Sequence, residues 1–186
     1  MKGYVVTKRI ILAVSGSISA YKAADLTSSL KKKSYDVNVI MTEASKAFIT
    51  PLTFQVLSKN PVHTDLMEEK LADRINHIDL SKEADLFIVA PASANTIAKL
   101  AHGVADNMLT ATALALPSTT PKLIAPAMNT KMYDNPLTKK NLNTLDQLGY
   151  QEILPKSGVL ACGDTGRGAL ADIDIILEAI DSKLIN

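Results

Sequence analysis

The chain has 186 residues, 47% of them hydrophobic, which suits one compact domain that we assign to residues 1–186. Basic and acidic side chains number 20 and 19, and the resulting charge of +1 gives no electrostatic basis for nucleic acid or a membrane as the main partner. The single cysteine, Cys162, excludes an intrachain disulfide and a cysteine-only zinc site. No apolar stretch reaches the roughly 20 residues that span a bilayer, so we expect a cytoplasmic protein. We also expect no bound metal.

Short apolar runs recur along the chain and lack the alternation of half-exposed strands. Such runs are typical of strands that are buried on both faces, as in a parallel sheet covered by helices. The predicted strands are Ile10–Val14, Val37–Met41, Leu86–Ala90, Leu123–Ala125 and the shorter Glu152–Leu154.

Segments with apolar residues at helical spacing separate these strands. The predicted helices are Ala20–Lys33, Phe48–Ser58, Thr96–His102, Met108–Leu116, Leu137–Leu148 and Ile173–Ile185. Alternation of strand and helix throughout predicts an α/β fold with a single Rossmann-like, doubly wound parallel sheet and helices on both faces.

The end of the first strand has the features of a phosphate-binding turn. Gly16 allows a sharp turn, and Ser15, Ser17 and Ser19 supply hydroxyls beside the start of a helix. The serines could equally cap that helix, and the two roles are compatible. The pattern is neither G-x-G-x-x-G nor a Walker A loop, so it favours a mononucleotide such as FMN over a dinucleotide.

The later strands also end in small and polar residues. Ligands of an open parallel sheet bind beyond the carboxyl ends of its strands, and small residues there let a planar ring approach the backbone. We therefore expect FMN to contact the small and polar residues at these ends: Gly16, Ser17, Ile18, Thr42, Ser45, Ser93, Ala94, Asn95, Thr96 and Ala127.

Five motifs in order, from Ile10 to about Ile180, carry a family resemblance. They are Gly16-Ser17-Ile18 with Ala20-Tyr21-Lys22, His77-Ile78-Asp79-Leu80, Pro91-Ala92-Ser93-Ala94-Asn95-Thr96, Pro126-Ala127-Met128-Asn129 with Met132, and Ala161-Cys162-Gly163-Asp164. With these motifs the chain resembles the homo-oligomeric flavin-containing cysteine decarboxylases. The resemblance implies FMN at the contacts of a homotrimer or an assembly of trimers. It also implies a free-standing decarboxylase, with a separate ligase for the preceding step.

The activity implied by the resemblance is decarboxylation of a small molecule, 4'-phosphopantothenoylcysteine, to 4'-phosphopantetheine in coenzyme A biosynthesis. The carboxylate of an N-acylated cysteine has no electron sink. Oxidation of its CH2–SH group to a thioaldehyde creates one, which explains why a reaction without net redox change needs a flavin. Loss of CO2 gives an enethiolate, which must then be reduced and protonated.

The resemblance also implies roles for individual side chains. His77 corresponds to the base of the thiol oxidation, Asn129 to the residue that binds the substrate carboxylate, and Cys162 to the final proton donor. Taken without its motif, a lone histidine is more often structural and a lone cysteine is usually a small buried apolar residue. Four glycines around Cys162 favour a lid over a core strand. Substrate contacts are expected from Asn129, Met132 and Arg167.

Two departures from the family pattern affect the substrate side of the predicted site. Tyr133 stands where relatives have tryptophan, and Arg167 and Ala169 differ from the usual sequence of the glycine-rich segment. Three alternatives share the fold. They are a flavin-binding regulatory protein without turnover, a decarboxylase of C-terminal peptidyl cysteines, and a flavin prenyltransferase. Intact His77, Asn129 and Cys162 argue against the first, and the Met128-Asn129 and Ala161-Cys162-Gly163 motifs argue against the third.

Overall fold

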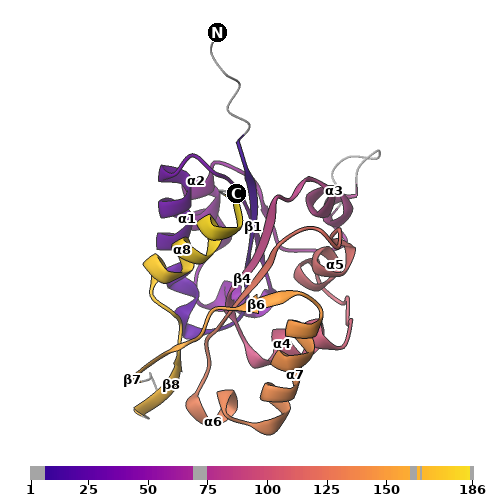
Figure 1. Cartoon of the computed structure of the whole chain (residues 1–186). Helices are drawn as coiled ribbons and strands as arrows, with labels where there is room; N and C mark the ends of the chain where they lie inside the picture. The colour runs from indigo at the N-terminus through magenta and orange to yellow at the C-terminus, as the bar shows by residue number, and fades with distance from the viewer. Residues whose placement is uncertain (1–6, 69–74, 160–162, 164, 185–186) are drawn as a thin grey trace.

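The computed structural model describes residues 7–68, 75–159, 163 and 165–184. Its central element is a six-stranded sheet, parallel throughout, with the strand order β3-β2-β1-β4-β5-β6. In Figure 1 this sheet, of which β1, β4 and β6 are labelled, lies between two groups of helices. The strands in chain order are β1 (Arg9–Val14), β2 (Asp36–Met41), β3 (Val62–His63), β4 (Leu86–Ala92), β5 (Lys122–Pro126) and β6 (Tyr150–Glu152). A separate antiparallel hairpin consists of β7 (Lys156–Val159) and β8 (Thr165–Ala169).

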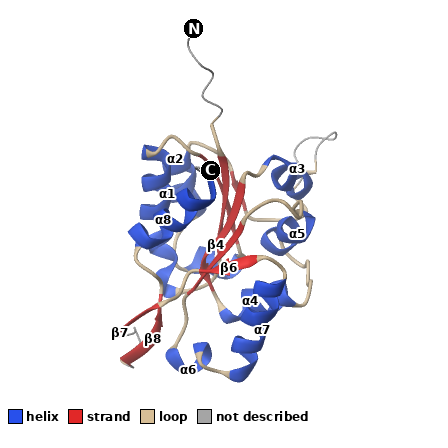
Figure 2. Cartoon of the chain, viewed as in Figure 1, coloured by secondary structure: helices blue, strands red, loops and turns tan. Residues whose placement is uncertain are grey.

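Helices cover both faces of this sheet (Figure 2). One face carries α1 (Lys22–Lys32), α2 (Pro51–Ser58) and α8 (Ile173–Leu184). The other carries α3 (Asn76–Glu83), α4 (Ala94–Ala101), α5 (Met108–Ala115) and α7 (Pro136–Gln147). Three short helical turns, η1 (Ile18–Tyr21), η2 (Glu43–Ala47) and α6 (Thr130–Tyr133), follow strands β1, β2 and β5.

The central strands are apolar on both sides because each side faces a core. In β1, Ile10 and Leu12 enter the core under α1, α2 and α8, whereas Ile11 and Ala13 enter the core under the other four helices. All four side chains are fully buried. This is the physical reason for the continuous apolar runs in the sequence.

The predicted doubly wound fold is confirmed, with differences in detail. The runs Ile10–Val14, Val37–Met41 and Leu86–Ala90 lie within β1, β2 and β4. The last predicted strand is displaced by two residues, because β6 is Tyr150–Glu152. The sequence did not predict α3, α6, β3 or the β7–β8 hairpin. The predicted helix Phe48–Ser58 begins only at Pro51.

The strand order places a binding crevice between β1 and β4. The chain proceeds from β1 to β2 and β3 on one side, then returns to β4 and continues to β5 and β6 on the other. Adjacent loops therefore diverge at the carboxyl ends of β1 and β4, where open α/β sheets bind their ligands. Among the described residues, no helix has the length and apolar content needed to cross a membrane.

Candidate active site

A cavity of about 880 Å³ lies at the carboxyl ends of the parallel strands. Residues that follow β1, β2, β4 and β5 line it, together with two residues of β8. The lining includes most of the predicted cofactor residues, namely Gly16, Ser17, Ile18, Thr42, Ser93, Ala94, Asn95, Thr96 and Ala127. Asn129 and Met132, which were predicted to contact the substrate, line the same cavity.

The turn after β1 is closely packed against the segment after β2. A Cβ atom added to Gly16 would lie 2.6 Å from the Cβ of Ala44, so only glycine fits here without displacing its neighbour. Ser17 precedes η1, and its hydroxyl accepts a hydrogen bond from the Ser19 amide at 3.2 Å. Ser17 therefore caps the helical turn, as the sequence suggested. Gly16, Ser17 and Ser19 also line the cavity, so the capping role does not remove the turn from the site.

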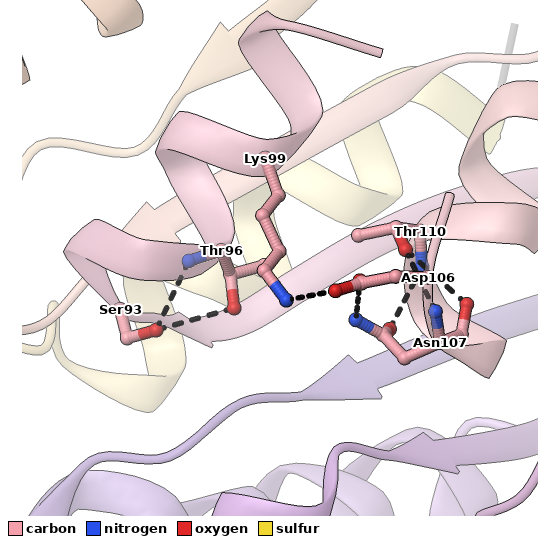
Figure 3. A network of polar contacts seen from close by, with 6 residues as sticks. All are labelled: Ser93, Thr96, Lys99, Asp106, Asn107 and Thr110. Atoms are coloured by element: carbon pink, nitrogen blue, oxygen red, sulfur yellow. Dashed lines mark hydrogen bonds and ion pairs between the residues drawn. The ribbon is translucent and has the colours of Figure 1, made fainter. Parts of the chain in front are cut away.

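Ser15 joins the turn after β1 to the segment after β4. Its side chain is fully buried, and its hydroxyl donates to the Pro91 carbonyl at 2.8 Å while accepting from the Ser93 amide at 2.8 Å. Ser93 in turn caps α4, because its hydroxyl accepts from the Thr96 amide at 3.3 Å and bonds to the Thr96 hydroxyl at 3.1 Å (Figure 3). Two strands thus hold their polar ends in one fixed arrangement.

An ion pair that sequence reasoning missed lines the wall formed by α4 and the start of α5. The Lys99 ammonium lies 2.5 Å from the Asp106 carboxylate, and Asn107 donates to Asp106 at 2.9 Å (Figure 3). Hydrogen bonding to Lys99 lowers the pKa of Asp106, a group at the surface. Asn107 and Thr110 form a capping box that begins α5. The Asp-Asn pair before an apolar helix was the available sequence signal.

The segment after β5 carries Asn129 at the start of α6. The Asn129 side-chain oxygen accepts from the Lys131 amide at 2.8 Å, which fixes the orientation of the side chain. The base of the hairpin lies against this segment, because the Met128 amide donates to the Gly168 carbonyl at 2.9 Å. A Cβ on Gly168 would lie 2.3 Å from the Met128 carbonyl oxygen, and one on Gly166 would lie 2.7 Å from Thr130. These glycines permit the close approach of the hairpin.

Three predicted residues do not line the cavity. Ser45 is buried, and its hydroxyl donates to the Thr42 carbonyl at 2.7 Å. Arg167 lies on β8 and acts electrostatically on Tyr133. His77 lies on α3, which contacts α5 and ends beside the amino end of β1, where Glu83 pairs with Arg9. Its Nδ1 is buried and lacks a hydrogen-bond partner among the described residues.

The predicted proton donor, Cys162, lies outside the described residues, between β7 and β8 in the sequence. The glycine-rich segment was predicted to be a lid, and its described parts form the hairpin outside the central sheet. No cluster of three potential metal ligands occurs in the part of the chain that the structure describes.

The chemistry of the lining divides the cavity into regions. Hydroxyls and a glycine turn lie at the ends of β1 and β4, where a phosphate could bind. Small apolar residues, Ala94, Ala127 and Met128, offer surface for a planar ring, and the Asn129 amide offers a neutral donor for a carboxylate.

The sequence is similar to known flavoproteins and cysteine decarboxylases over nearly the whole chain. A model of the Flavoprotein family matches residues 3–185. The chain is 63% identical over 178 residues to a probable phosphopantothenoylcysteine decarboxylase of Streptococcus mutans, covering 96% of this chain and 99% of that protein. It is 50% identical over 171 residues to the coenzyme A biosynthesis bifunctional protein CoaBC of Bacillus subtilis, covering 92% of this chain but only 42% of that relative's length.

Solved structures agree in fold. A cysteine-to-serine mutant of PPC decarboxylase complexed with pantothenoylaminoethenethiol matches with a TM-score of 0.87 and 34% identity, covering 97% of this chain and 100% of that one. The FMN-dependent cysteine decarboxylase SpaF matches with a TM-score of 0.84 and 32% identity, covering 96% and 95%. The extent of these matches, together with the family model, shows that this chain belongs to the Flavoprotein family.

Proposed function

We propose that this chain is an FMN-dependent decarboxylase that converts 4'-phosphopantothenoylcysteine to 4'-phosphopantetheine in coenzyme A biosynthesis. The observation that carries the proposal is 63% identity across 99% of a relative with that named activity. The cavity at the ends of β1 and β4 supports it, since it combines a phosphate turn with the Asn129 amide. The intracellular pathway and the lone Cys162 favour a cytoplasmic location.

The residues present fit FMN. Gly16 packs closely against Ala44, and the serine hydroxyls of the same turn can hold one phosphate. The cavity volume of about 880 Å³ admits a mononucleotide beside a substrate. Ser17, Ser93 and Thr96 would hold polar groups of the cofactor, and Ala94 and Ala127 would border its ring. Bound there, FMN would accept a hydride from the cysteine CH2–SH group and later return it.

The side chains of the protein supply the proton transfers and the binding of the substrate. His77 is assigned as the base that takes the thiol proton during oxidation. The Asn129 amide binds the substrate carboxylate as a neutral donor, so the carboxylate is oriented without a full countercharge that would oppose its departure. The Cys162 thiol is assigned as the acid that protonates the carbon from which CO2 has left.

We further propose that the working form is a homotrimer, or an assembly of trimers, in which His77 acts on the cavity of a neighbouring copy. The support is the separation within one chain, because His77 does not line the cavity that contains Asn129.

A complementation experiment tests this arrangement. His77→Asn and Asn129→Ala proteins are each expected to be inactive, whereas co-expression of both should restore activity. Random assembly gives about a quarter of the shared sites one intact His77 and one intact Asn129. Assay of the co-purified proteins, with differently tagged copies, measures the recovery. Complete inactivity of verified mixed oligomers would place both residues in the same chain's site.

The activity itself is tested with purified protein and phosphopantothenoylcysteine, followed by mass spectrometry of the products. The expected result is 4'-phosphopantetheine and CO2, from a yellow protein that releases FMN on denaturation. Peptides with a C-terminal cysteine serve as the control substrate, because the alternative cysteine decarboxylase would act on them. FAD as the sole released flavin, or turnover of the peptides alone, contradicts the proposal.

A further inference from the structure

A hydrogen bond between Tyr133 and Glu152 connects the segment that carries Asn129 to the neighbouring edge strand of the sheet. Tyr133 is the last residue of α6, and its side chain is only 2% exposed. Its hydroxyl donates to a carboxylate oxygen of Glu152 at 2.8 Å. Glu152 ends β6 and pairs in register with Ile124 of β5, the strand that leads to Asn129. The hydrogen bond therefore fixes α6 to the neighbouring strand.

The surroundings of Tyr133 make this contact strong. Burial and the Glu152 carboxylate hold the pKa of Tyr133 well above its usual value, so the hydroxyl remains a donor at physiological pH. A hydrogen bond to a charged acceptor is stronger than one between neutral groups. The Lys139 ammonium lies 3.3 Å from the centre of the Tyr133 ring.

The hairpin lies beside α6, because a Cβ added to Gly166 of β8 would lie 2.7 Å from Thr130. The charge of Arg167, on β8, opposes the rise in the Tyr133 pKa, which places Arg167 within electrostatic reach of the ring. Tyr133 and Arg167 are two of the positions at which this chain departs from the family pattern. Tyr133 and Arg167 lie outside the cavity lining, whereas the third departure, Ala169, lines the cavity.

We propose that Tyr133 is a positioning residue, whose hydroxyl, held by Glu152, fixes the segment Asn129–Met132 and thereby sets the affinity for the substrate carboxylate. This inference rests on the proposed function. Tyr133 does not line the cavity, whereas Asn129 and Met132 do, so it acts through them. A misplacement of about 1 Å caused by a change far from the chemistry can cost an enzyme about 10²-fold, which makes a remote anchor consequential.

The test is Tyr133→Phe, which removes the hydroxyl and retains the ring. The KM for phosphopantothenoylcysteine is expected to rise about tenfold with kcat changed less than about twofold, because ground-state binding is lost. Amide hydrogen exchange in residues 129–134 of the FMN-loaded protein should become about tenfold faster. FMN content should remain that of the wild type, because the phosphate turn is untouched.

Tyr35→Phe is the matched control. The Tyr35 hydroxyl also donates to a carboxylate at 2.8 Å, that of Asp181 on α8, and this pair lies away from the cavity. Its loss should lower the melting temperature comparably and leave KM and exchange in residues 129–134 unchanged. Glu152→Ala should reproduce Tyr133→Phe, and the double variant should be no worse than either single variant, since both remove one hydrogen bond.

The inference is overturned if Tyr133→Phe leaves exchange in residues 129–134 at the wild-type rate, or if Tyr35→Phe raises KM equally. Additive effects of Tyr133→Phe and Glu152→Ala would also overturn it. Hydrogen exchange needs no turnover, so it decides the positioning role by itself. Failure of the proposed function would be seen separately, as a wild-type protein that does not convert phosphopantothenoylcysteine.

Discussion

Replacing His77 by asparagine is expected to slow the oxidation of the substrate thiol by roughly 10²–10⁴-fold, the usual contribution of a positioned general base. Asparagine retains a polar side chain of similar reach but cannot accept the thiol proton at neutral pH. FMN should remain bound, because the side chains assigned to hold it, Ser17, Ser93 and Thr96, are unchanged. The substrate should also still bind, because Asn129 is unchanged.

Anaerobic mixing of the variant with substrate measures this step directly, as bleaching of the flavin absorbance. Wild-type protein should bleach transiently during turnover, until the reduced flavin returns its hydride, whereas the His77→Asn protein should stay yellow throughout. His102→Asn is the matched control, since His102 is an exposed histidine at the end of α4 whose Nδ1 lies 2.9 Å from the Ala98 carbonyl. Bleaching at the wild-type rate in the His77 variant would remove His77 from the mechanism.

The parts of the fold that the sequence predicted are those with a strong hydrophobic pattern. β1 and β4 contain unbroken apolar runs because both faces are buried, and in β2 the run is interrupted only by the half-buried Asn38. The elements that were missed carry a weaker pattern. In α3 only Leu80 and Ser81 are buried, and α6 spans a single turn that tertiary contacts stabilise. The displacement of β6 reflects its position at the sheet edge, where Gln151 is exposed.

The cavity lining was predictable for a related reason. In a parallel sheet the carboxyl ends of all strands meet at one edge, so the small and polar residues after each strand had to converge. Ser45 shows the limit of this reasoning, since a hydroxyl beyond a strand can be used entirely by a local carbonyl, here that of Thr42. The Lys99–Asp106 pair was missed because it joins α4 to the loop before α5, and no regular spacing in the sequence indicates such a pair. The proposed contribution of His77 to the cavity of a second copy would be equally invisible in one chain's sequence pattern.

Replacing Cys162 by alanine is expected to divide the reaction into its two halves. Under the proposed scheme Cys162 acts only after CO2 has left, when the enethiolate is reduced and protonated. Oxidation and decarboxylation should therefore still occur once, since His77, Asn129 and the FMN-binding residues are unchanged.

The product of the Cys162→Ala protein should be the oxidised enethiol, two hydrogens lighter than 4'-phosphopantetheine, with the flavin left reduced until oxygen reoxidises it. Mass spectrometry detects the enethiol product, and flavin absorbance detects the reduced flavin. Cys162→Ser should behave similarly, because an alcohol is a much weaker acid than a thiol. A cysteine with only a packing role predicts a different pair of results, either normal product or a general loss of folding and flavin. Ordinary 4'-phosphopantetheine at the wild-type rate would show that the last proton comes from another group.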